Sequence, residues 1–294
     1  MSYIPGRWAN TGLGNGGLAQ LIIRFITLVY NTTMDSISRF GTVGWALKIL
    51  SLTIFTIFPA LAKAKDLSFT SSANQVALLE LYSSEGCSSC PPADQFFASL
   101  RENKNLWSSF VPVGFHVDYW DRLGWVDKLA QKEFTQRQRL YARFWNSNRV
   151  YTPGLVLNGN EWKQWRNGIS LPPQQSAGVL QLTARPSGKV SAVFSPQKTL
   201  KRPQLFVALL ANGVSSKVLT GENAGRTLHH EFVALDLAQS VMTASKNKWE
   251  ATVEIGSQAK VTVPRYAIAA WVTDQSRHHP LQSVGSDLPS GWLK

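Results

Sequence analysis

Cysteine is scarce in this sequence, because the 294 residues contain only two, Cys87 and Cys90. Any cysteine chemistry is therefore confined to one Cys-x-x-Cys pair. A long apolar run is also missing: residues 49–58 form an apolar run of about ten residues, which is too short to span a bilayer. No phosphate-binding loop, nucleotide fingerprint or Ser-His-Asp set is present. The basic residues form no run, so a nucleic-acid partner is not expected.

The run at residues 49–58 has the flanks of a secretory signal. Lys48 precedes it, and small residues suited to cleavage follow at Ala62 and Ala64. We therefore expect an exported bacterial protein, periplasmic or secreted, without a transmembrane span in its mature chain. The alternative for this run is a buried core helix.

Residues 1–64 are expected to form an N-terminal extension plus this signal. A signal of ordinary length begins at Met34, which predicts that residues 1–33 lie upstream of the true start; the alternative is an amphipathic membrane-surface helix over residues 18–30. The segment holds five of the 30 basic and one of the 18 acidic residues, so the rest of the chain carries a net charge of +8. The scattered charges favour a solvated basic surface. The partner they imply is an anionic surface of the cell envelope, bound weakly.

The central stretch of the sequence is residues 76–100, VALLELYSSEGCSSCPPADQFFASL. Residues 76–82 are apolar except for Glu80 and predict a buried strand. Turn residues follow, and then the cysteines. Pro91 and Pro92 are tolerated in the first turn of a helix, which we expect to continue through Leu100. This order places Cys87 at a helix N-terminus, where free amides and the helix dipole favour a thiolate.

Residues 111–119 predict a second strand, with His116 and Asp118 on one face near its carboxyl end. Residues 126–145 predict an amphipathic helix. Its expected apolar stripe consists of Val126, Leu129, Ala130, Phe134, Leu140, Tyr141, Phe144 and Trp145.

Residues 151–182 predict a hairpin and a final helix. A short strand at 155–157 precedes Asn158-Gly159, which is a strong hairpin signal, and 161–165 is the expected return strand. Residues 171–182 begin with two prolines and predict the last helix of the first domain. From residue 185 onward, short β-rich runs alternate with turns, which is typical of an antiparallel sandwich, and Asn212-Gly213 predicts another hairpin.

Three motifs together resemble a bacterial secreted family, the domain of unknown function 1223: LYSSEGCSSCPPAD, FHVDYWDRLGW and YTPGLVLNG. The Cys-x-x-Cys-Pro pattern also resembles a thioredoxin-like redox site. The resemblance implies an α/β thioredoxin-like domain at 73–184, followed by a smaller all-β, sandwich-like domain at 185–294. It also implies that Pro153 enters its hairpin through a cis Thr152–Pro153 bond beside the cysteines. It carries no settled activity.

Three functions are compatible with these residues. The first is thiol–disulfide exchange with protein thiols of the envelope, in which an exposed Cys87 attacks, a buried Cys90 resolves, and His116 and Asp118 handle protons. The catalytic set would then be Cys87, Cys90, Pro153, His116 and Asp118, with no cofactor. The second is a copper or zinc site built from Cys87, Cys90 and His116. The third is a non-catalytic binding module with a structural disulfide.

Two further histidine pairs, His229-His230 and His278-His279, are interpreted as surface or packing residues. Each pair lies in or after an expected strand, where neighbours point to opposite faces, so neither pair predicts a metal site. His116–Asp118 has its own alternative, a hydrogen-bonded structural pair beneath the cysteines.

Overall fold

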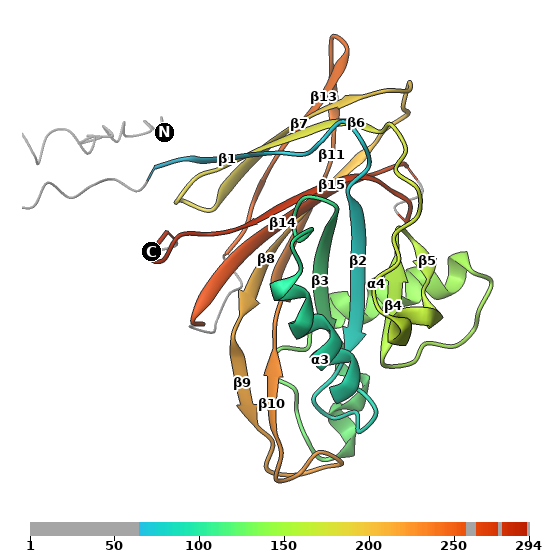
Figure 1. Cartoon of the computed structure of the whole chain (residues 1–294), viewed down its shortest axis with the longest axis vertical. Helices are drawn as coiled ribbons and strands as arrows, with labels where there is room; N and C mark the ends of the chain where they lie inside the picture. The colour runs from blue at the N-terminus through green and yellow to red at the C-terminus, as the bar shows by residue number, and fades with distance from the viewer. Residues whose placement is uncertain (1–64, 257–262, 276–277, 293–294) are drawn as a thin grey trace, which may run out of the picture. The chain divides into compact units, whose positions relative to one another are not determined.

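A mixed eight-stranded sheet runs through the molecule in the order β15-β14-β8-β11-β3-β2-β4-β5 (Figure 1). The description covers residues 65–256, 263–275 and 278–292 of a computed structural model. The strands are β2 (Ala77–Ser83), β3 (Phe110–His116), β4 (Gly154–Leu157), β5 (Asn160–Glu161), β8 (Gln204–Asn212), β11 (Val233–Val241), β14 (Arg265–Thr273) and β15 (Pro280–Asp287). β3 is parallel to β2 and β11, and every other neighbouring pair is antiparallel.

A second, antiparallel sheet packs on the C-terminal strands of the first. Its strands are β1 (Leu67–Thr70), β6 (Gly178–Ala184), β7 (Lys189–Pro196), β13 (Lys248–Glu254) and β12 (Thr243–Ser245), in that spatial order. Along β8, Leu205, Val207 and Leu209 belong to the core shared with this sheet, whereas the alternate residues belong to the core under the helices. β8 is therefore buried on both faces, which explains its continuous apolar sequence.

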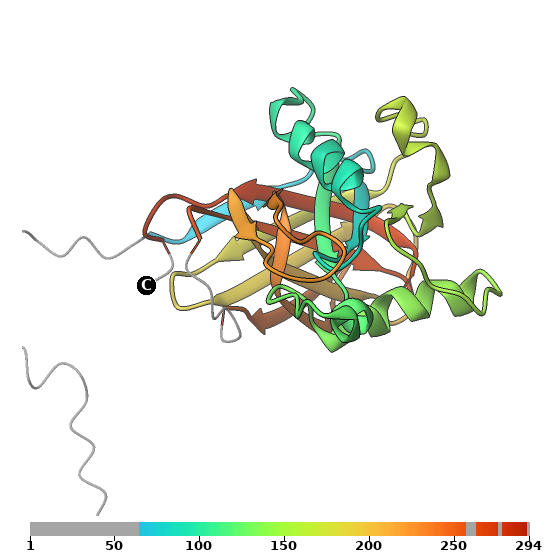
Figure 2. The same cartoon turned by 90° about the horizontal axis from the view of Figure 1, so that it is seen from below.

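Two helices lie on opposite faces of the β2–β3 region, α3 (Pro91–Ser99) and α4 (Lys132–Phe144) (Figures 1 and 2). Three 3-10 turns accompany them, at Leu100–Glu102, Asp118–Leu123 and Lys163–Asn167. The stripe expected for residues 126–145 is wrong in part, because Val126, Leu140 and Phe144 are exposed. The helix starts at Lys132, and the face at helical spacing that meets the sheet contains Phe134 and Tyr141, as expected, together with Arg137 and Gln138.

The expected fold, a thioredoxin-like α/β domain followed by a separate sandwich, is wrong. The molecule is mostly β-sheet, and the described residues fall within one compact unit. The edge of β3 pairs with β11, where the amide of Gly114 donates to the Phe232 carbonyl, so the sheet continues into the C-terminal half. The expected domain boundary after residue 184 lies within the hairpin that pairs β6 with β7.

The helix expected at residues 171–182 is also absent, because β6 occupies its second half. Burial alternates along this strand, with Leu180, Leu182 and Ala184 facing the core. This period of two is the strand pattern, and the prolines at 172 and 173 lie in irregular chain before it. The two-residue period is visible in the sequence of residues 180–184, where apolar and polar side chains alternate.

A long hairpin carries the C-terminal half back to the cysteine loop. The hairpin expected at Asn212-Gly213 is wrong, because β8 continues into β9 (Val214–Lys217), which pairs with β10 (Thr227–His230) just before β11. The two breaks have positive φ, 71° at Gly213 and 58° at Phe232. We call residues 214–230 the arm. Figure 1 shows the arm extending past α3 at the lower end of the sheet.

β15 is hydrogen-bonded to Val76, the residue just before β2. The side chain of Gln282 accepts from the amide of Val76 at 2.8 Å and donates to the carbonyl of Gly178 at 2.7 Å. The hydroxyl of Ser283 donates to the Val76 carbonyl at 2.7 Å. These contacts tie three strands together at the upper end of the sheet.

Residues 1–64, which contain the expected signal and extension, lie outside the described residues. Within the described ranges, no helix has both the length and the apolar character needed to cross a bilayer.

Candidate functional site

The two cysteines lie in the loop that joins β2 to α3 and form a disulfide, with 5.5 Å between their Cα atoms. Cys90 is the N-cap residue of α3, whose first two residues are prolines without an N–H group. The next two amides, of Ala93 and Asp94, donate to the carbonyl oxygen of Cys90. The free helix amides that were expected to stabilise a Cys87 thiolate are therefore absent or already bonded.

Both cysteines are buried, so the expected exposure of Cys87 is wrong. Cys87 is 1% exposed and Cys90 is 0% exposed, whereas Ser88 and Ser89 between them face solvent. The loop therefore presents its two serines, and its sulfur atoms point inward.

The arm covers this loop. Asn223, which is fully buried, donates from Nδ2 to the carbonyl oxygens of Glu85 and Cys87, at 2.9 Å each. The amide of Ser88 donates to Oε2 of Glu222 at 3.1 Å. Because local sequence does not reveal that residues 222–223 return to residues 85–88, the burial of Cys87 could not be predicted.

Pro153 lies where it was expected, close to the cysteine loop. The Thr152–Pro153 peptide bond is cis, as predicted. The hydroxyl of Ser89 lies 3.5 Å from the Thr152 carbonyl oxygen, and the indole of Trp120 donates to Oγ1 of Thr152 at 2.7 Å. Trp120 and Thr152, which belong to two of the three family motifs, thus meet beside the cysteine loop.

His116 ends β3 and is paired with Asp127. Its Nδ1 lies 2.7 Å from Oδ2 of Asp127, and both side chains are buried. The amides of Glu85 and Leu129 also donate to the Asp127 carboxylate, at 2.9 Å each. Asp127 therefore holds the imidazole ring and the cysteine loop together.

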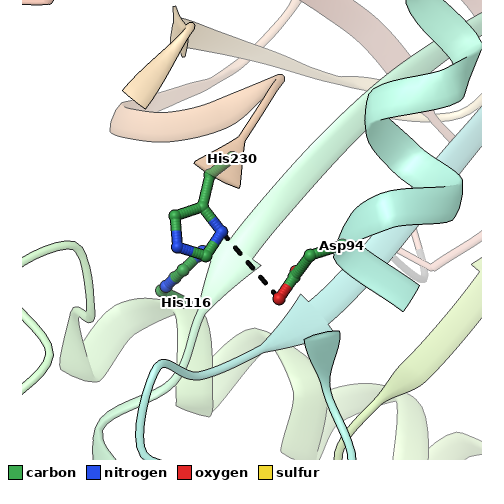
Figure 3. A group of neighbouring side chains, drawn as sticks. All are labelled: Asp94, His116 and His230. Carbon is green, nitrogen blue, oxygen red and sulfur yellow. Dashed lines mark ion pairs between the residues drawn. The ribbon is translucent and has the colours of Figure 1, made fainter. Parts of the chain in front are cut away.

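Three more buried ionisable residues surround His116. The ring of His230, from the arm, stands edge-on to that of His116 with 4.8 Å between centroids. His230 Nδ1 lies 3.9 Å from Oδ2 of Asp94, drawn as the dashed line in Figure 3, and His230 Nε2 lies 3.5 Å from Oε1 of Glu85. Asp94 also accepts from the hydroxyl of Ser83 at 2.9 Å, and Glu85 accepts from the Trp125 indole at 2.7 Å.

Burial and mutual charge shift the pKa values of this cluster. Burial lowers the pKa of His116, but the charge of Asp127, the hydrogen bond to it and the nearby carboxylates raise that pKa to about 9. Burial raises the pKa of Asp127, but the His116 charge and hydrogen bonds bring it below its ordinary value. Burial also raises the pKa of Asp94. The shifts therefore favour the charged forms of His116 and Asp127 and the neutral form of Asp94.

The family model of DUF1223, proteins of unknown function, matches residues 78–273. The chain belongs to the DUF1223 family. The membership expected from the three motifs is thus confirmed. No curated protein matches the chain.

Two solved structures resemble this DUF1223 protein. Protein AGR_C_4864 from Agrobacterium tumefaciens has 23% identity and a TM-score of 0.53, over 76% of this chain and 98% of that one. HBP35 of Porphyromonas gingivalis has 15% identity and a TM-score of 0.51, over 75% of this chain and 79% of that one. At such low identity these structures are similar to the DUF1223 chain in fold alone.

Asp118 is not the partner of His116 in this DUF1223 protein. β3 ends at His116, so the two-residue alternation that placed both side chains on one face stops there. Asp118 begins a 3-10 turn, and its Oδ1 accepts from Thr135 of α4 at 2.6 Å. Asp127, which no sequence motif marks, takes the position expected of Asp118.

The copper or zinc set of Cys87, Cys90 and His116 is not assembled in the DUF1223 structure. Across the described ranges, one group of three or more metal-ligating side chains has its ligand atoms within 4.8 Å of one another, and it consists of Asp94, His116 and His230. Neither cysteine belongs to this group.

The two histidine pairs lie in different surroundings. His229 is exposed and His230 is buried, as strand alternation predicts, but His230 lies in the cluster and is not a plain surface or packing residue. His278 and His279 contact Phe144, away from the cysteine loop. Asp94 could have been found from its position one helical turn after Cys90, whereas no local signal identifies Asp127 or His230.

Proposed function

We propose that this DUF1223 protein is a thiol–disulfide oxidoreductase acting through Cys87 and Cys90. The observation that carries the proposal is the disulfide, which pairs the only two cysteines of the chain across two exposed serines at the start of a helix. A bond that closes so short a loop removes little chain entropy, so it is a weak device for stability alone. A reversible role explains it better.

In the proposed exchange, a partner thiolate attacks the sulfur of Cys87 and forms a mixed disulfide. The Cys87–Cys90 bond breaks, and Cys90 leaves as a thiolate that takes up a proton. A second partner thiolate then attacks the mixed disulfide, so that the partner is oxidised and Cys87 is released. The reverse sequence reduces a partner disulfide.

The surroundings of the disulfide support proton handling. Glu85 and His116 both contact Asp127, whose carboxylate accepts from the amide of Glu85, two residues before Cys87. We assign proton exchange to the His116–Asp127 pair in place of His116–Asp118. Pro153, whose residue type offers no amide hydrogen, is assigned to the face of the loop that receives a partner.

The proposed partners are protein thiols and disulfides of the cell envelope. The support is the signal-like run at residues 49–58, because exported compartments are where disulfides form and persist.

Variants of the two cysteines test this function. Cys90→Ser removes the resolving thiol, so mixed disulfides with partners should accumulate through Cys87, whereas Cys87→Ser should trap none. Non-reducing electrophoresis of envelope extracts measures the adducts, and the double serine variant is the control. Adducts of equal abundance in both single variants would contradict the assigned roles.

Burial of both cysteines favours a second candidate, a binding module whose disulfide is structural. The reduction potential separates the two. Exchange proteins have potentials of about −120 to −270 mV, whereas structural disulfides lie below about −300 mV. We expect a value in the first range from equilibration of the full chain with glutathione or dithiothreitol buffers, and a value in the second range would replace the oxidoreductase with the binding module.

A further inference from the structure

Four buried polar atoms of this cluster make no hydrogen bond and face one another only in two long ion pairs, at 3.5 and 3.9 Å. They are Oδ2 of Asp94, Oε1 of Glu85, and both ring nitrogens of His230. Buried polar groups in folded proteins are almost always hydrogen-bonded, so four that lack a hydrogen bond in one place indicate an additional bound species between them. Asp94, His116 and His230 also line a small cavity of about 10 Å³, which is close to the least volume that admits one water-sized species.

We propose that Asp94, His116 and His230 bind a divalent first-row transition-metal ion of the zinc type. The ligands would be Oδ2 of Asp94, Nε2 of His116 and Nδ1 of His230, so that the proton exchange proposed for His116 would belong to the metal-free protein. These side chains come from α3, β3 and the arm, and one metal-ligating atom of each lies within 4.8 Å of the other two. Ligands on one zinc ion lie roughly 3–4 Å apart, so small side-chain rotations complete the site.

The groups behind the three ligands match those of metal sites, where each ligating imidazole donates its other N–H to a carboxylate. Nδ1 of His116 contacts Asp127 at 2.7 Å, which leaves Nε2 for the ion. Nε2 of His230 faces Glu85 at 3.5 Å, which leaves Nδ1. The second oxygen of Asp94 is held by Ser83. Each ligand thus has an outer partner that sets its direction.

The buried carboxylates around the three ligands also favour a bound cation. Asp94, Asp127 and Glu85 place three buried carboxylates around two imidazoles, and their ion pairs in the described part of the chain are with histidine alone. Buried charges are normally paired or coordinate a metal. A divalent cation would pair with these carboxylates and satisfy His230, whereas a single water molecule would do only the latter.

Zinc binding by the full chain tests the site. After chelation and reloading with Zn²⁺, the wild-type protein should retain about one zinc ion per chain by elemental mass spectrometry, as expected for one three-ligand site. His230→Gln should weaken zinc binding at least about 100-fold because it removes a direct ligand, and Asp127→Asn about 10- to 100-fold because it acts through His116. His229→Gln, on the exposed face of the same strand, is the matched control and should bind as wild type does.

Two further measurements keep the outcome independent of variant folding and of the proposed redox function. Co²⁺ bound to wild-type protein should show ligand-field bands without thiolate charge-transfer absorption. The Cys87→Ser/Cys90→Ser double variant should retain zinc. Absence of zinc or cobalt binding by wild-type protein would overturn the proposal, and so would loss of the metal in the double cysteine variant. Failure of the thiol-trapping experiment leaves these results unaffected.

Discussion

Replacing Arg137 with Met should lower the free energy of unfolding by about 3–5 kcal/mol. Arg137 of α4 is buried, and its Nε donates to Oε1 of Glu80 in β2 at 2.8 Å. Four aromatic rings surround its guanidinium, those of Phe115, Tyr141, Phe206 and Trp271. Removing the cation leaves the Glu80 carboxylate buried and uncompensated at the junction of α4 with the central sheet, which is the origin of the large loss.

Urea unfolding followed by circular dichroism measures this effect. Arg139→Met, an exposed arginine on the same helix, is the matched control and should change stability by no more than about 0.5 kcal/mol. The double variant Glu80→Gln/Arg137→Met removes both charges, so it should recover much of the loss. A loss below about 1 kcal/mol for Arg137→Met alone would show that the ion pair does not hold the helix to the sheet.

The second large effect is expected at Asn223, which should control access to the disulfide. Asn223→Ala deletes both hydrogen bonds to the carbonyls of Glu85 and Cys87, and it also leaves Arg226, which donates to Oδ1 of Asn223 at 2.8 Å, without that acceptor. Orphaning buried partners costs about 1–3 kcal/mol. If the arm must open locally before reduction, the disulfide should be reduced about 5- to 150-fold faster.

The rate of disulfide loss under dithiothreitol, followed by alkylation and mass spectrometry, checks this expectation. Glu222→Gln is the control, because Glu222 is an exposed neighbour that contacts Ser88 of this loop, and glutamine keeps an oxygen that can accept from the Ser88 amide. Equal reduction rates for Asn223→Ala and wild-type protein would mean that the arm does not gate the cysteines.

Local elements were predictable because their signals are local. β2 and β3 are mostly apolar runs, Pro91 marks the first turn of α3, and Asn158-Gly159 has the positive φ values of the predicted turn, 48° and 84°. The overall fold was not predictable, because it depends on the pairing of β3 with β11 over more than a hundred residues. That pairing uses backbone groups, and these carry no side-chain signature.

The residues of the candidate site also fall into two groups, those with a local sequence signal and those without one. Cys87, Cys90, His116 and Pro153 were selected from motifs, and the structure places them around one loop. Asp127 was missed because a 3-10 turn interrupts the strand period after His116. His230 was interpreted as a surface or packing residue because it and His229 point to opposite faces of a strand, and only the tertiary path of the arm brings His230 to α3.

The contacts of β15 also constrain the order of events during synthesis. Val76, which leads into the strand before the cysteine loop, bonds to Gln282 and Ser283, more than two hundred residues later. The arm that buries Cys87 likewise follows the loop by more than a hundred residues. A nascent chain therefore emerges with its thiols uncovered and its first central strand unanchored. Residues 83–94 stay accessible to solvent throughout that interval, before the finished protein encloses them.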